Sequence, residues 1–222
     1  MDKMIELKTK DGFTLSAYKA EPAGKAKGGL VIIQEIFGVN HHIRAVADRF
    51  AALGYTCVAP ALFDRVERGV DIGYDESAMK RGVDTRAKTK LDDTLLDLTA
   101  AIGALKGAGK IGVVGYCWGG SLAFLSATRL EGIAGTVGYY GGMIAGHAQE
   151  KPKVPVMLHF GEQDKGIPMT DVEKVKAARK DVEVHTYPAG HGFSCDERGS
   201  FDKASHEKAL ERTLAFFSKH VG

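Results

Sequence analysis

The stretch VGYCWGGS, from Val114 to Ser121, places one cysteine among three glycines. An apolar run precedes it and a second apolar run follows it, an order typical of a buried strand that turns sharply into a helix. Gly115-x-Cys117-x-Gly119 matches the nucleophile-elbow pattern, with cysteine in place of serine. The small neighbours avoid steric collision at the strained turn. The free N–H groups and the positive dipole end of the helix that starts there both favour the reactive thiolate. The stretch therefore predicts an α/β sheet with a nucleophilic thiol at a strand end.

The rest of the chain alternates strand patterns with helix patterns. The N-terminal stretch MDKMIELKTKDG and the residues after it predict two strands around an Asp11-Gly12 turn. Residues 30–33 are a short apolar run, and 91–105 carry leucine and isoleucine at helical spacing. Alternating strands and helices indicate a mostly parallel central sheet with helices on both faces. We expect one domain over residues 1–222.

Two segments give weaker predictions. Residues 63–90 are polar and show little periodicity, so we expect a long excursion over the surface. Thr170 stands three residues before Glu173, a spacing that predicts a capping box at the start of a helix.

Composition excludes several classes of function. The chain has 222 residues, a formal net charge of +2 and no basic cluster, so we expect no nucleic-acid partner. No apolar run is long enough to span a bilayer, and no membrane partner is expected. Three scattered cysteines and no signal-peptide pattern predict a reducing cytoplasm. No CxxC pair or phosphate-binding glycine loop occurs, so we expect neither metal nor cofactor. The oligomeric state is not indicated, and a monomer is the working expectation.

Two further predicted strand ends carry the groups that a nucleophile needs. Asp164 ends the segment HFGEQD, and His191 lies in YPAGHGF. The chain order nucleophile, acid, histidine is that of the α/β-hydrolase fold. Ligands in such sheets bind beyond the carboxyl ends of the strands. We therefore predict that Cys117 is the nucleophile, His191 its base and Asp164 the partner that orients the base.

The segments QEIFGVN, VGYCWGGSLAF, YYG, HFGEQD and YPAGHGF resemble the dienelactone hydrolase family, the carboxymethylenebutenolidases, over nearly the whole chain. This resemblance implies an intracellular hydrolase that opens an unsaturated lactone through a thioester on Cys117. It also implies that Glu35 helps to deprotonate the thiol, and a carboxylate in an apolar setting could accept that proton. The alternative for Glu35 is a carboxylate at the rim of the cleft, paired with a surface lysine or arginine.

The resemblance also implies the oxyanion hole and the substrate contacts. The backbone N–H groups of Trp118 and Ile36 would hold the oxyanion. Phe37 would line the substrate site, with ordinary core packing as its alternative. Arg81 is our choice for the residue that binds a substrate carboxylate. Lys80 and Arg86 compete with it, and Arg198 stands farther from His191 than the arginine of the characterised lactonases does from its histidine.

Other candidate residues have simpler interpretations. We expect Cys57 and His159 to lie in the core, the histidine with its hydrogen bonds satisfied. Cys195 stands four residues after His191, and a metal or redox role is the less favoured interpretation of it.

Three functions remain open at this point. The first is a cysteine-dependent hydrolase of an enol lactone or activated ester. The second is a broader carboxylesterase or thioesterase on the same residues. The third is a redox- or electrophile-sensing thiol protein without turnover, which would need neither Asp164 nor Glu35.

Overall fold

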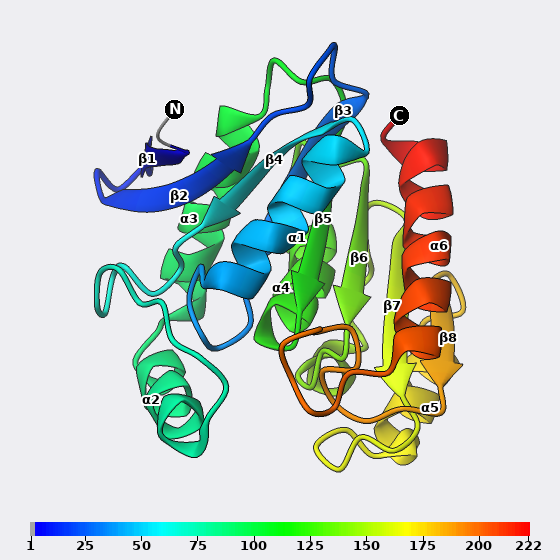
Figure 1. The fold of residues 1–222 in the computed structure, drawn as a ribbon. Helices are drawn as coiled ribbons and strands as arrows, with labels where there is room; N and C mark the ends of the chain where they lie inside the picture. Colours follow the sequence, from blue (N-terminus) through cyan, green and yellow to red (C-terminus); the bar gives the residue numbers. More distant parts are fainter. Residues whose placement is uncertain (1–2) are drawn as a thin grey trace. The chain divides into compact units, whose positions relative to one another are not determined.

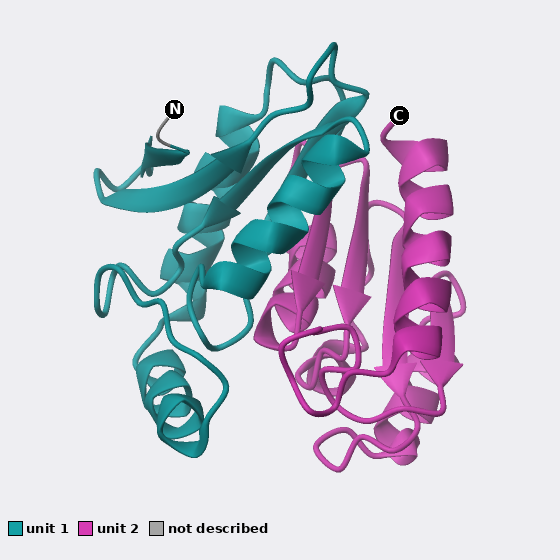
Figure 2. Cartoon of the chain, viewed as in Figure 1, with its two compact units in different colours: residues 1–111 teal, residues 112–222 magenta. Residues whose placement is uncertain are grey.

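A computed structural model describes residues 3–222 of the chain. Compact units comprise residues 1–111 and 112–222, coloured separately in Figure 2, and each is described by itself. Met1 and Asp2, the first residues of the N-terminal strand prediction, lie outside the described residues. One domain over residues 1–222 stays a prediction.

Unit 1 combines an antiparallel hairpin with a parallel strand pair. Its strands are β1 (Met4–Lys8), β2 (Thr14–Ala20), β3 (Gly28–Ile33) and β4 (Tyr55–Pro60), and its helices are α1 (His41–Ala52), α2 (Glu76–Ala87) and α3 (Leu91–Ala104). The strands follow the order β1-β2-β4-β3. The pairs β1–β2 and β2–β4 are antiparallel, while β3 and β4 are parallel. Helices α1 and α3 cover opposite faces of these strands (Figure 1).

Unit 2 is a parallel α/β arrangement. Its strands are β5 (Ile111–Tyr116), β6 (Gly135–Tyr139), β7 (Val156–Gly161) and β8 (Glu183–Tyr187), and its helices are α4 (Trp118–Arg129), the short 3-10 helix η1 (Ile144–His147), α5 (Met169–Ala178) and α6 (Lys203–His220). The strands follow the order β5-β6-β7-β8, and all neighbours are parallel. Helices α4 and α6 lie on opposite faces (Figure 1). The prediction of a mostly parallel sheet with helices on both faces is confirmed.

Burial explains why the central strands form where they do. Every residue of β3, β5, β6 and β7 is buried, as expected for parallel strands covered on both sides. Helix α4 is buried along its length except at Arg129, which matches its apolar sequence. The arrowheads of β5 to β8 point the same way in Figure 1. The residues that follow these strands therefore gather at one end of unit 2.

One local prediction was wrong, and one predicted surface segment contains a helix that was not predicted. The segment 63–90 contains helix α2, which begins after its N-cap Asp75 and buries only Ala78, Gly82 and Thr85. Because that buried face is made of small residues, it gives no apolar periodicity. The capping box at Thr170 does not form, because Pro168 is the N-cap of α5 and Thr170 is already inside the helix.

No helix among residues 3–222 combines the length and the apolar character that crossing a membrane requires. The cytoplasmic location stays a prediction.

Candidate active site

Cys117 occupies a strained turn between β5 and α4. Its backbone has φ 57° and ψ −117°, and residues other than glycine seldom adopt such a positive φ. Its N–H donates to the Tyr139 carbonyl at 3.0 Å, and its carbonyl accepts from Gly120 N at 3.0 Å. A Cβ on Gly115 would lie 1.9 Å from the Gly119 carbonyl oxygen, so only glycine fits there. The predicted elbow geometry is therefore present, and strain of this kind is concentrated at functional sites.

Asp164 and His191 form a close pair at the ends of β7 and β8. His191 Nδ1 and Asp164 Oδ2 are 2.7 Å apart. The Asp164 side chain is fully buried, and its other oxygen accepts from the backbone N–H groups of Gly166 at 2.8 Å and Ile167 at 3.2 Å. These bonds hold the carboxylate in place, so that it accepts from Nδ1 and leaves Nε2 for chemistry.

The pKa of His191 depends on both Asp164 and Cys117. Burial lowers the pKa of His191, but hydrogen bonds with Asp164 and Cys117 outweigh it and raise that pKa to about 10. The imidazole therefore carries a proton near neutral pH. A protonated imidazole beside a sulfur favours the thiolate, which is the nucleophilic form.

Aromatic rings pack around the histidine. The Tyr140 ring lies 5.1 Å from the His191 ring, centroid to centroid, and 5.4 Å from the Phe193 ring. Tyr140 is fully buried and has a positive φ of 38°. Tyr140 directly follows β6 and packs its ring against the catalytic histidine candidate.

Three predicted residues follow β3 in unit 1. Glu35, Ile36 and Phe37 are all buried, at 1%, 8% and 1% exposure. The phenol of Tyr74 donates to Glu35 Oε2 at 3.0 Å. Tyr74 was not predicted from the sequence, since a tyrosine within a polar stretch gives no signal of its own.

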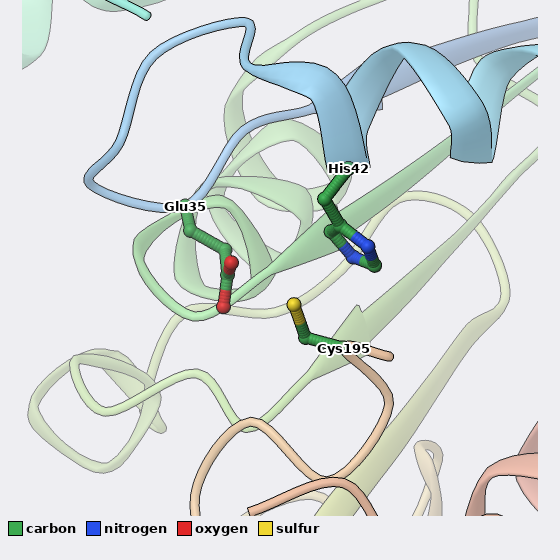
Figure 3. A group of neighbouring side chains, drawn as sticks. All are labelled: Glu35, His42 and Cys195. Atoms are coloured by element: carbon green, nitrogen blue, oxygen red, sulfur yellow. The ribbon is translucent and has the colours of Figure 1, made fainter. Parts of the chain in front are cut away.

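Figure 3 draws Glu35, together with His42 in the first turn of α1, and both belong to unit 1. Cys195, which the figure also labels, belongs to unit 2 and is fully buried. These three side chains carry metal-ligating atoms. Because they are divided between the two units, no metal centre is assigned to them.

The basic candidates are placed differently. Arg81 pairs with Glu67, and the two side chains are 50% and 48% exposed. The Arg198 guanidinium packs on Gly192, where an added Cβ would lie 2.7 Å from one of its terminal nitrogens. Arg198 therefore lies beside the backbone that immediately follows His191.

Two predictions of core residues are confirmed. Cys57 is fully buried in β4, and burial raises the pKa of its thiol. His159 is fully buried in β7, where its Nδ1 lies 2.8 Å from the Tyr187 hydroxyl and its Nε2 lies 3.1 Å from the Thr213 hydroxyl. Both ring nitrogens are thus satisfied.

A sequence profile described as "Dienelactone hydrolase family" matches residues 15–221. The chain belongs to this family. A protein of Azospirillum brasilense is 36% identical over 98% of this chain and 99% of its own, and one of Synechocystis is 32% identical over 93% and 92%. Both are named "Putative carboxymethylenebutenolidase".

Solved structures agree with the family assignment. The crystal structure of a "Putative Dienelactone Hydrolase" from Klebsiella pneumoniae matches with a TM-score of 0.86 and 27% identity, over 98% of each chain. The protein is a dienelactone hydrolase-like carboxylic ester hydrolase of the α/β-hydrolase fold.

Proposed function

We propose that this dienelactone hydrolase family member opens an enol lactone or activated ester through a thioester on Cys117. The observation that carries the proposal is the 2.7 Å bond between His191 and Asp164, in the unit that also holds the strained Cys117. The pKa of about 10 at His191, to which the Cys117 hydrogen bond contributes, supports a thiolate–imidazolium pair.

In the first step the Cys117 thiolate attacks the carbonyl carbon and forms a C–S bond. The resulting oxyanion collapses, and the bond from the carbonyl carbon to the ring oxygen breaks. The leaving enolate takes a proton from the His191 imidazolium, so that the enzyme is left as a thioester with neutral histidine. Asp164 stabilises the imidazolium throughout and keeps the ring in the tautomer that transfers the proton.

In the second step water attacks the thioester while His191 accepts one of its protons. The C–S bond breaks and releases the carboxylic acid. Cys117 leaves as a thiolate, which restores the ion pair with protonated His191. The sum is the addition of one water across the acyl–oxygen bond, with no oxidant or reductant.

The remaining roles follow the family resemblance. The backbone N–H groups of Trp118 and Ile36 stabilise the oxyanion. Where Cys117 still carries its proton, Glu35 accepts it when substrate arrives, and the thiolate then enters the steps above. Phe37 contacts the substrate. Arg81 binds a substrate carboxylate, and the position of Arg198 beside Gly192 makes it a second candidate for that contact.

A thiol nucleophile suits a stabilised leaving group. Because thiolate is itself a good leaving group, a tetrahedral intermediate expels it in preference to an alkoxide. An enolate competes better with the thiolate as the leaving group than an alkoxide does. Enol lactones are therefore favoured over simple alkyl esters as substrates.

Steady-state kinetics with α-angelica lactone, p-nitrophenyl acetate and ethyl acetate test this function, with Cys117→Ala as the blank. We expect the lactone and the activated ester to be hydrolysed, and Cys117→Ala to be inactive on both. Iodoacetamide labelling of Cys117 should track the loss of activity. Full activity after complete labelling would refute the nucleophile. A reactive Cys117 without turnover on any probe would instead favour the sensing protein.

Cys117→Ser separates the leaving-group argument from the rest. We expect the serine variant to fold normally and to gain no strong activity on α-angelica lactone. Equal substrate profiles for serine and cysteine enzymes would remove the argument.

A further inference from the structure

The buried carboxylate of Glu35 has a defined hydrogen-bond donor. The Tyr74 hydroxyl lies 3.0 Å from Glu35 Oε2, and Glu35 is 1% exposed. A carboxylate this deeply buried is costly unless it accepts hydrogen bonds. A donor to the charged form also favours that form over the protonated acid.

The direction of this hydrogen bond follows from Asn40, the N-cap of α1. Asn40 Oδ1 accepts from the Ile43 backbone N–H at 3.2 Å, which fixes the orientation of the amide. Its Nδ2 therefore donates to the Tyr74 hydroxyl oxygen at 3.1 Å and to the Ile72 carbonyl at 3.2 Å. Because that phenol oxygen already accepts from Asn40, its own proton is directed to Glu35. The chain of bonds thus runs one way, from Asn40 through Tyr74 to the carboxylate.

Neighbouring contacts hold Tyr74 against the Glu35 segment. The Phe37 and Tyr74 rings are 4.6 Å apart in an edge-to-face arrangement, and Ile72 N donates to the Phe37 carbonyl at 3.2 Å. Helix α2 approaches the same segment through Gly82, where a Cβ would lie 2.2 Å from the Ile36 carbonyl oxygen. The polar segment before α2 is therefore packed on the residues that follow β3.

We propose that Tyr74 is a positioning residue that acts through Glu35. Its phenol fixes one carboxylate oxygen and so holds the carboxylate in the orientation from which it accepts a proton. The inference rests on the proton-accepting role of Glu35 in the proposed function. His42, also in unit 1, is a titratable group near this carboxylate, and one of its ring nitrogens lies within 4.8 Å of a Glu35 oxygen.

The first test measures Glu35 directly, without activity. The pKa of its carboxyl is followed by NMR in protein labelled with ¹³C-glutamate, and Glu35→Gln assigns the signal. In Tyr74→Phe, which keeps the ring and removes only the hydroxyl, we expect that pKa to rise by about one pH unit. Tyr18→Phe is the matched control, because Tyr18 donates to the Asp48 carboxylate at 3.0 Å elsewhere in unit 1. An unchanged Glu35 pKa in Tyr74→Phe overturns the inference.

The second test is a double-mutant comparison of kcat/KM on α-angelica lactone as a function of pH. We expect Tyr74→Phe to move the acid limb upward by about one unit, and to have no further effect in the Glu35→Gln background. An equal loss in both backgrounds overturns the inference, because Tyr74 would then act without Glu35. Wild-type kinetics in Glu35→Gln would instead overturn the proposed role of Glu35. The NMR result would then still report on the Tyr74 contact itself.

Discussion

Replacing Asp164 with asparagine removes the charge that stabilises the His191 imidazolium and leaves the shape of the site intact. The pKa of His191 is about 10, against an ordinary value of 6.5. Burial opposes the charged form, so losing the Asp164 carboxylate should bring that pKa back toward 6.5. At about pH 8 the protonated fraction would then fall from about 99% to about 3%, roughly a 30-fold loss of the reactive pair. An asparagine amide can also hold the wrong tautomer, which in serine-protease triads brings the loss to about 10⁴-fold.

The assay is kcat/KM for p-nitrophenyl acetate from about pH 5 to 10, together with an NMR titration of the His191 ring. We expect a 30-fold to 10⁴-fold loss in Asp164→Asn and a lowered pKa of the ring. Glu162→Gln is the control, since it neutralises an exposed carboxylate two residues before Asp164 that accepts from the Thr186 hydroxyl. A loss smaller than about threefold, with an unchanged ring pKa, would refute the electrostatic reasoning.

The same shift predicts how stability depends on pH. A histidine whose pKa is raised on folding contributes stability that is complete below its unfolded pKa of 6.5 and is lost as the pH rises through about 10. In urea unfolding, wild type should therefore lose stability relative to Asp164→Asn between these limits. If the difference in the free energy of unfolding between wild type and Asp164→Asn stays constant across that pH range, the pKa of His191 is not raised on folding.

Three further outcomes are expected. Gly115→Ala should lower the free energy of unfolding by at least about 3 kcal/mol, because the added Cβ would overlap the Gly119 carbonyl. A urea-unfolding midpoint equal to that of wild type would contradict the elbow geometry. Trp118→Ala should lower stability but keep kcat within about tenfold of the wild-type value, since only the backbone N–H of this residue is used. Thiol titration gives the concentration of active sites for this kcat. A variant as inactive as Cys117→Ala would contradict that role. Arg198→Ala should raise KM about tenfold for p-nitrophenyl hemisuccinate and leave p-nitrophenyl acetate unchanged, whereas an effect confined to Arg81→Ala would favour the residue chosen from the sequence.

The core of the fold was predictable because its strands are short, continuous apolar runs. Residues 30–33 lie in β3 and residues 111–116 form β5, and both are buried throughout. The rule that strand ends carry chemistry also placed Asp164 and His191 correctly with respect to their strands. Their hydrogen bond is the part of the site that sequence order alone anticipates.

What the sequence did not predict depends on contacts that leave no periodic pattern. Helix α2 buries only alanine, glycine and threonine side chains, so its apolar face is invisible to hydrophobic spacing. Tyr74 reaches Glu35 from 39 positions away through a tertiary hydrogen bond, and no local rule connects them. Helix α5 begins at Met169 because Pro168 precedes it, and this outweighs the spacing of Thr170 and Glu173.

The left-handed backbone conformation at Cys117 can be occupied equally well by cysteine or by serine. The steric penalty of that conformation arises at Cβ, which cysteine and serine share, so exchanging sulfur for oxygen adds no new strain. A single-atom exchange can therefore change the chemistry while the scaffold stays as it is. A cysteine-to-serine exchange, or the reverse, can therefore arise in evolution without compensating substitutions in the turn that holds the nucleophile.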